Sequence, residues 1–159
     1  MLLEKSGEIA PEKIKRLSQS KNNTQLWMGL VIEGRVNAVK SNIGTWNVRS
    51  MNQGKLEVVK QEMARVNIAT LGISELKWTG MGEFNSDDHY IYYCGQESLR
   101  RNGVAITVKK RVRNAILGCS LKNNRMISVC VQGIAINIPV IQDHAPTSNA
   151  EVGWFSEDL

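Results

Sequence analysis

Apolar residues in the first half of the chain form two short runs, around residues 43–46 and 68–73. A polar residue lies at or just after the end of each run, Asn47 and Glu75, and apolar residues recur at helical spacing between the runs. A strand, an amphipathic helix and a second strand in this order are typical of buried sheet strands that are covered by helices. The pattern therefore predicts a strand–helix–strand unit whose strand ends hold Asn47 and Glu75 firmly within reach of a ligand.

The helix between the two runs has one apolar face. Ser50 or Asn52 is suited to cap its N-terminus, and Gln53 lies three residues after Ser50, as a capping box requires. Asn67 is a suitable exit residue. The apolar face carries Leu56, Val59, Met63 and Val66, whereas the residues predicted to point away are Lys55, Glu57, Lys60, Gln61, Glu62 and Arg65.

Beyond residue 78 the pattern predicts a meander of short strands. Residues 79–88 combine glycines with acidic residues, which is typical of a loop. Aromatic and β-branched residues then predict strands at residues 89–95, 103–108, 115–117, 126–131 and 133–142. Pro139 has no backbone N–H to donate, so the last strand fits only the edge of a sheet or a bulge.

Residues 1–41 differ from the rest of the chain. They contain no apolar signal-peptide region after the first three residues, and the apolar run at residues 26–32 is far too short to span a bilayer. We expect residues 1–41 to form a poorly ordered N-terminal extension and residues 42–159 to form the domain. The alternative is that the run at residues 26–32 adds an edge strand or docks on the domain.

Composition narrows the class of protein. The 159 residues suit one domain, and 42% hydrophobic content is enough for a packed core. The formal net charge of +5 indicates a mild preference for anionic partners such as nucleic acid. Three cysteines without C-x-x-C spacing predict reduced thiols in an intracellular protein, nuclear or cytoplasmic and not secreted. No membrane association is expected.

Asn47 and Glu75 are the candidate chemical groups. A carboxylate at a strand end is a hard oxygen ligand suited to Mg²⁺, which proteins hold with one or two carboxylates together with waters and substrate phosphate. An amide beside it can bind a phosphate oxygen or a metal-bound water without adding charge. Taken singly, each residue also has an ordinary structural interpretation, because Asn47 can cap a turn and Glu75 can be a solvated carboxylate.

The sequence from about residue 42 onward resembles the endonuclease/exonuclease/phosphatase superfamily. More closely, it is similar to the apurinic-type endonuclease domain of LINE-type non-LTR retrotransposons of the RTE (BovB) clade. The segments that carry the resemblance are residues 45–49, 71–78, 90–95, 101–106 and 145–149. The resemblance implies an α/β fold, the N-terminal half of a layered α/β sandwich, and descent from a Mg²⁺- or Mn²⁺-dependent DNA endonuclease that hydrolyses phosphodiesters.

The resemblance also implies roles for individual residues. It makes Glu75 the metal ligand and Asn47 an orienting catalytic residue. His144 stands where the family has a tyrosine that donates a hydrogen bond on the phosphate side, and an exposed loop histidine is the alternative. The residues that match nucleic-acid-contacting positions are Arg49, Lys77 and Arg125.

Two motifs of the family have no match in these residues: the Gly-Asp-x-Asn segment, which supplies the catalytic aspartate, and the closing Ser-Asp-His. We therefore expect a truncated, catalytically incomplete endonuclease domain that binds Mg²⁺ weakly if at all. The alternative is a non-catalytic remnant that binds nucleic acid or protein. A half-domain built on one sheet, roughly residues 43–142, leaves one sheet face uncovered, so we also expect self-association through that face.

Overall fold

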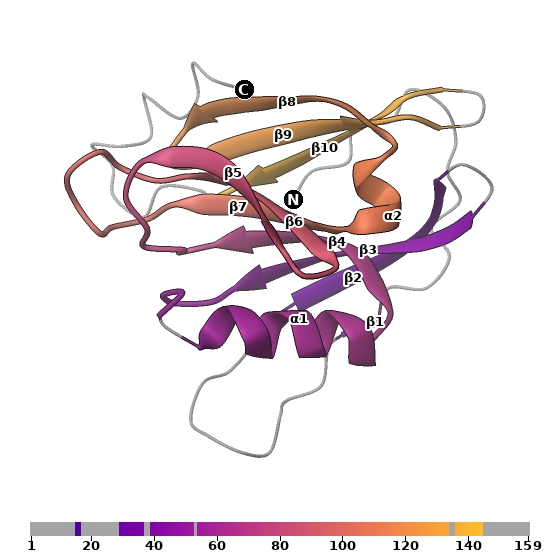
Figure 1. The fold of residues 1–159 in the computed structure, drawn as a ribbon, viewed down its shortest axis with the longest axis horizontal. Coiled ribbons are helices and arrows are strands. Elements are labelled where there is room, and N and C mark those ends of the chain that lie inside the picture. The colour runs from indigo at the N-terminus through magenta and orange to yellow at the C-terminus, as the bar shows by residue number, and fades with distance from the viewer. Residues whose placement is uncertain (1–14, 17–28, 37–38, 53, 134–135, 145–159) are drawn as a thin grey trace.

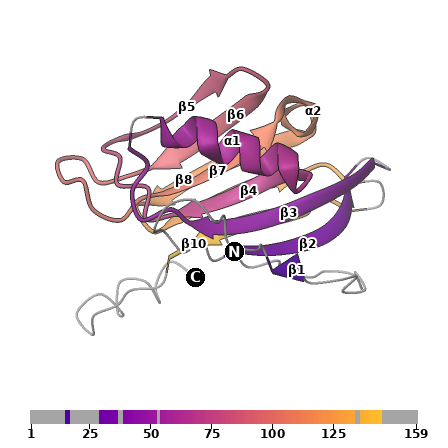
Figure 2. The ribbon, with the colours of Figure 1, turned by 90° about the horizontal axis from the view of Figure 1, so that it is seen from below.

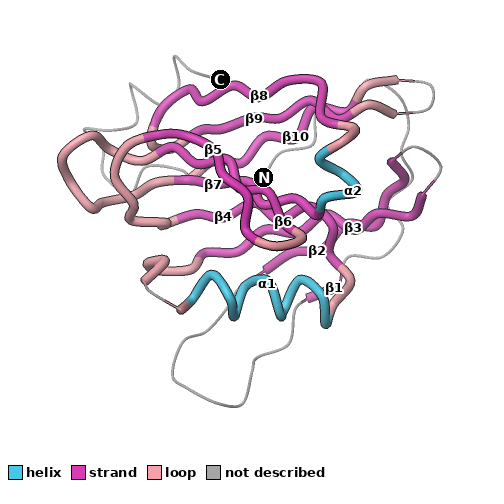
Figure 3. The backbone as a smooth tube through the Cα atoms, viewed as in Figure 1, coloured by secondary structure: helices cyan, strands magenta, loops and turns pink. Residues whose placement is uncertain are grey.

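Two β-sheets pack face to face, and a helix covers the other face of the larger sheet (Figures 1 and 2). The computed structural model describes residues 15–16, 29–36, 39–52, 54–133 and 136–144. Strands dominate this part of the chain, and its two helices are short (Figure 3). The expected α/β class is therefore observed, and the two sheets form a sandwich.

The larger sheet has seven strands. In spatial order they are β1 (Lys15–Arg16), β2 (Gly29–Val36), β3 (Val39–Asn47), β4 (Ile68–Ser74), β7 (Val104–Lys109), β6 (His89–Cys94) and β5 (Met81–Ser86). Strands β3 and β4 run parallel and are connected by helix α1 (Lys55–Arg65), whereas all other neighbours are antiparallel. The predicted strand–helix–strand unit is thus confirmed.

The smaller sheet has three antiparallel strands, in the order β10 (Ile138–Asp143), β9 (Met126–Val131) and β8 (Ile116–Asn123), and one turn of helix, α2 (Lys110–Arg113), precedes it. Strand β10 lies at its edge, where Pro139 was predicted to fit. The expectation of a single sheet with one bare face was wrong. Apolar residues of both sheets, among them Ile106, Ile127 and Val140, form one buried cluster between them.

Helix α1 packs on the opposite face of the larger sheet. Val59 and Met63 are fully buried against β4, and Leu56 and Val66 are partly buried beside them, as the helical spacing predicts. Burying a side chain of this kind stabilises the fold by about 1.5–3 kcal/mol. The predicted cap was wrong: the helix begins after Gly54, whose φ of 83° is in the left-handed region, and no side chain caps it.

Two further predictions about the surface of the larger sheet were wrong. Residues 81–86 form strand β5 rather than a loop, because Phe84 and the neighbouring positions alternate between packed and exposed along β6. Lys60 does not point away from the fold. Its ammonium is buried and contacts Glu57, Asp87 and the Ser86 hydroxyl, which tie α1 to the turn between β5 and β6.

The apolar run in the N-terminal segment contributes to the sheet. The second half of this run lies in strand β2, which pairs with β3 in register from Gly29↔Trp46 to Val36↔Val39. The run therefore adds a strand to the sheet, as the alternative predicted, although the two-residue strand β1 lies outside it. The division of the chain between residues 41 and 42 stays a prediction, since most of residues 1–28 lie outside the described residues. Ser148 and Glu151 also predict a capping box, and these two residues lie outside the described residues as well.

A buried glutamine forms a polar contact between the two sheets. Gln142 of β10 is 1% exposed and accepts a hydrogen bond from the Thr45 hydroxyl of β3 at 3.0 Å. It lies against Gly72 of β4, where an added Cβ atom would be 1.9 Å from the Gln142 Oε1 atom. The glycine therefore makes room for a polar contact between β10 and β3.

Candidate functional site

The parallel strands β3 and β4 end side by side, and this brings Asn47 and Glu75 together. Asn47 is in register with Ser74, the residue before Glu75. One N–H of the Asn47 amide donates to Glu75 Oε1 at 2.8 Å, and the Asn47 Oδ1 atom accepts from the Arg49 backbone N–H at 3.0 Å. The amide is therefore held at both ends and fixes the orientation of the carboxylate.

Two more of the predicted residues lie close to Glu75, and both come from the smaller sheet. His144 follows β10, and Arg125 lies in the turn between β8 and β9. The His144 backbone N–H donates to the Arg125 carbonyl at 2.9 Å, and Arg125 Nη1 donates to the His144 carbonyl at 3.2 Å. The His144 ring then reaches Glu75, with 3.5 Å between Nε2 and Oε1. Side chains from both sheets thus converge on Glu75.

The charge state of His144 follows from its neighbours. Burial lowers the pKa of His144, and Arg125 lowers it as well, whereas Glu75 and Asp143 act in the opposite direction without reversing the shift. The ring is therefore neutral at pH 7. Arg125 Nη1 lies 3.4 Å from Nδ1, and because a guanidinium can only donate, Nδ1 is the acceptor and Nε2 carries the proton that faces Glu75.

The loops that carry these residues have an unusual backbone. Arg49, Ser50, Glu75, Lys77 and Asn102 all have positive φ values, of 52°, 126°, 54°, 58° and 50°. Such conformations cost of order 1–3 kcal/mol each in non-glycine residues and persist where the surroundings enforce them, often at functional sites. Here backbone hydrogen bonds fasten the loops to one another, including Leu76 N–H to the Gly103 carbonyl at 3.0 Å.

The other two predicted nucleic-acid-binding residues lie on these loops. Arg49 is exposed directly after Asn47, and Lys77 is partly exposed two residues after Glu75. Lys55 lies close by, donates to the Val48 carbonyl at 2.6 Å, and has a pKa lowered by burial and by the positive charge of Lys77. The surroundings of the carboxylate are therefore basic, which favours an anionic ligand.

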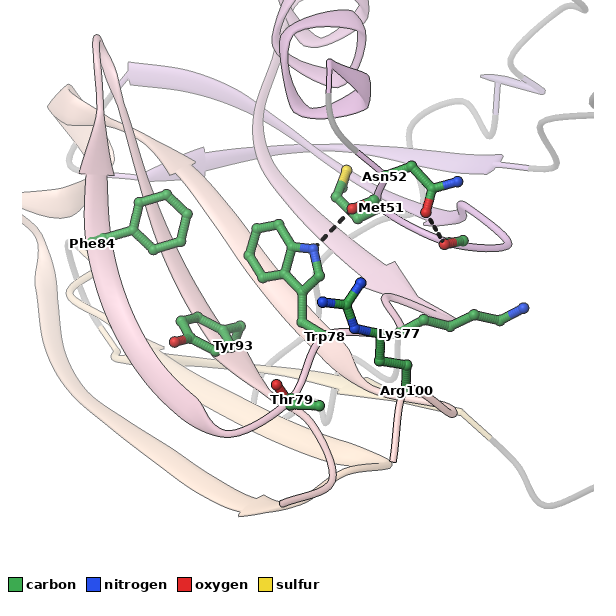
Figure 4. A pocket seen from close by; sticks show the side chains of 9 residues that line it. Met51, Asn52, Lys77, Trp78, Thr79, Phe84, Tyr93 and Arg100 are labelled. Carbon is green, nitrogen blue, oxygen red and sulfur yellow. Dashed lines mark hydrogen bonds between the residues drawn. The ribbon is translucent and has the colours of Figure 1, made fainter. Parts of the chain in front are cut away.

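A pocket of about 480 Å³ opens beside this cluster, and sequence reasoning missed it (Figure 4). Its aromatic residues are Trp78, Phe84 and Tyr93, and the Trp78 Nε1–H donates to the Met51 carbonyl at 2.8 Å. The remaining lining residues are Ser50, Met51, Asn52, Lys77, Thr79 and Arg100. The prediction of a loop at residues 79–88 gave no indication of the pocket, because Phe84 lines it from strand β5.

The donor set around Glu75 is sparse for a metal site. Within the described residues, no group of three or more His, Cys, Asp or Glu side chains is close enough together to hold a metal ion. Glu75 offers one carboxylate, of which one oxygen already accepts from Asn47, and the side chain is 30% exposed. Mg²⁺ commonly completes such a site with waters and substrate phosphate. The arrangement suits an ion shared with a ligand better than a preformed cage.

No family model matches the chain, but comparison with curated proteins gives two relatives. The chain is 74% identical over 120 residues to craniofacial development protein 2 from Bos taurus, and 72% identical over 120 residues to that from Tragulus javanicus. Each match covers 74% of this chain but only 20% and 21% of the relatives. The chain therefore spans about a fifth of the length of the curated relatives that it matches.

The length and hydrophobicity of a helix decide whether it can cross a membrane. None of the helices in the described part of the chain has both the length and the apolar character needed to cross a lipid bilayer.

Proposed function

We propose that the chain carries the phosphate- and metal-facing part of a nucleic-acid phosphodiesterase site. Its type is the Mg²⁺-dependent DNA endonuclease of the endonuclease/exonuclease/phosphatase superfamily that retrotransposons of the LINE type encode. One observation carries the proposal: Asn47, Glu75, His144 and Arg125 come from four separate segments and two sheets, yet they form one contiguous polar cluster. Parallel pairing of β3 and β4 accounts for the contact between Asn47 and Glu75, but it does not account for His144, which reaches Glu75 from the other sheet.

Each residue has a role in this proposal that follows from its contacts. Glu75 would hold Mg²⁺ or Mn²⁺, and a bound ion would supply polarisation of a phosphate oxygen. Asn47 orients the Glu75 carboxylate and has a second amide N–H for a phosphate oxygen. His144 is neutral and presents its Nε2–H beside Glu75, where it can donate to the same phosphate. Arg125 positions His144.

Arg49 and Lys77 would contact neighbouring phosphates. Both follow a cluster residue by two positions on loops that are fastened to each other, and both add positive charge near Glu75. Contacts of this kind supply affinity without sequence preference and weaken as the salt concentration rises.

In this proposal, the 159 residues alone bind nucleic acid but do not hydrolyse it. Hydrolysis needs a group that activates water, and an acid or base partner is typically worth about 10²–10⁴-fold in rate. The Gly-Asp-x-Asn and Ser-Asp-His motifs that supply such groups in the resembling family are not found in this sequence. A non-catalytic nucleic-acid-binding remnant is the second candidate, favoured by this missing chemistry.

The test is the affinity of the chain for a short DNA duplex with and without Mg²⁺. We expect Mg²⁺ to strengthen binding, and Glu75→Gln to remove the Mg²⁺ effect while leaving the fold intact. Asp88→Asn is the matched control, since it removes one negative charge from an exposed turn and should leave the effect unchanged. Equal affinity with and without Mg²⁺ would overturn the metal role, and nicking of supercoiled plasmid that Glu75→Gln abolishes would show that these residues suffice for catalysis.

A further inference from the structure

The pocket beside Glu75 has three aromatic rings that line it from three segments. Trp78 follows the Glu75 loop, Phe84 lies on β5 and Tyr93 lies on β6. The ring centroids of Trp78 and Tyr93 are 5.4 Å apart at 86°, and those of Phe84 and Tyr93 are 6.0 Å apart at 70°. Because the Trp78 N–H is bonded to the Met51 carbonyl, its indole is fixed as a rigid, apolar surface.

Apart from Met51, the other residues that line the pocket are polar or basic. Arg100 and Lys77 bring two positive charges, and none of the nine lining residues is acidic. Figure 4 draws both side chains among those that line the pocket, and Lys77 extends away from the three rings. A ligand that complements these walls combines a flat aromatic group with negative charge. A volume of about 480 Å³ lies within the range of ligand pockets in general.

The pocket shares its backbone with the Glu75 cluster. Ser50, Met51 and Asn52 directly follow Arg49, and Lys77 and Trp78 follow Glu75 within three residues. The Met51 N–H donates to the Leu76 carbonyl at 2.9 Å, so the two loops form one unit. One ligand can therefore contact both the pocket and the loop that carries Glu75.

We propose that this pocket is a stacking site for one unpaired base of a single-stranded nucleic acid, whose backbone continues to Glu75. The proposal rests on the proposed function, because it places a phosphate at that cluster. An unpaired base is favoured over a base pair because the pocket offers aromatic surfaces, and a base in a duplex already has both faces stacked. Every base has such a face, so the site selects single strands rather than a sequence.

The test compares two single-stranded ligands of equal length and charge, a short oligothymidylate and an oligomer of the same length in which every base is replaced by an abasic tetrahydrofuran. Stacking one base on aromatic side chains is worth about 5- to 150-fold in affinity, which corresponds to about 1–3 kcal/mol. We expect oligothymidylate to bind the 159-residue chain more tightly than the abasic strand by a factor in this range. Equal affinities for the two strands would overturn the proposal, whatever the variants do.

Two variants locate the effect. Phe84→Leu keeps an apolar side chain but removes a ring, so it should weaken binding of oligothymidylate and leave the abasic strand unchanged. Leu117→Ala, which alters an exposed apolar residue on β8, is the control and should change neither. An unaltered preference for oligothymidylate in folded Phe84→Leu would place base stacking elsewhere and overturn the proposal for this pocket.

Failure of this proposal and failure of the proposed function are distinguishable. The preference for bases is measured without metal, and the effect of Glu75→Gln is measured with Mg²⁺. A base preference that Phe84→Leu removes, together with no Mg²⁺ effect on binding, supports the pocket and rejects the metal role. A Mg²⁺ effect that Glu75→Gln removes, together with equal binding of the two strands, supports the metal role and rejects the pocket.

Discussion

Replacing Gly72 by alanine tests how the two sheets are held together. The new Cβ atom would lie 1.9 Å from Gln142 Oε1 and 2.8 Å from Gln142 Cδ, so the glutamine has to move. Gln142 is 1% exposed and has little space to move into, and moving it breaks the 3.0 Å hydrogen bond from Thr45. Overpacking a core typically costs about 1–3 kcal/mol, and leaving a buried polar group unsatisfied costs about 1–3 kcal/mol more.

We therefore expect Gly72→Ala to lower the free energy of unfolding by about 2–6 kcal/mol, measured by urea denaturation. Gly118→Ala on β8 is the matched control, because a Cβ atom there meets nothing within 4 Å. That variant should be neutral or slightly stabilising, since alanine loses less backbone entropy on folding than glycine.

A double-mutant cycle tests the cause of the destabilisation. In a Gln142→Ala background the carboxamide is gone, so adding Gly72→Ala should cost much less than it does alone. A cost of Gly72→Ala that is the same in both backgrounds would refute the reasoning, because the clash with Gln142 would then not be its source.

Two further predictions concern the larger sheet. Burial lowers the pKa of Lys60, but hydrogen bonds to Asp87 and Glu57 outweigh this effect and raise the pKa above its usual value. Lys60→Met should therefore destabilise the fold, whereas Lys110→Met, which alters an exposed lysine, should not. Thermal melts of the two variants compare their stabilities. The pKa of His89 is lowered from 6.5, first by burial and then by Lys109 and Lys60, with Asp87 and Asp88 opposing. The unfolded chain then binds the proton more readily, so His89 contributes stability above pH 6.5 that is lost as the pH falls below it. Denaturation at a series of pH values should show this slope, and His89→Gln should reduce it; an unchanged slope would contradict the shift.

The local elements of the fold were predictable because their patterns are local. Val59 and Met63 fall on one face at helical spacing, and the runs that end near Asn47 and Glu75 are apolar enough to be strands. The side-chain contact between those two residues follows from parallel pairing of β3 and β4. Sequence reasoning placed them together for this reason.

The relation between the sheets was not predictable in the same way. Strands β8 to β10 pair with one another and turn back over the larger sheet, and this depends on long-range contacts such as that of Gln142 with Gly72 and Thr45. Lys60 was assigned to the surface because helical spacing places it off the apolar face, but its partner Asp87 lies 27 residues away in sequence. The aromatic pocket was missed since Trp78, Phe84 and Tyr93 come together only across β5 and β6.

The most direct test of the central claim is where a paramagnetic divalent ion binds. Mn²⁺ added to the isotope-labelled chain should broaden the backbone amide signals closest to Glu75, including those of Arg49, Leu76 and His144, and high concentrations will be needed because one carboxylate is a poor site. Glu75→Gln should abolish this broadening while the remaining signals keep their positions. Broadening centred instead on the exposed carboxylates of Asp87 and Asp88, and unchanged in Glu75→Gln, would contradict a metal and phosphate site at the ends of β3 and β4.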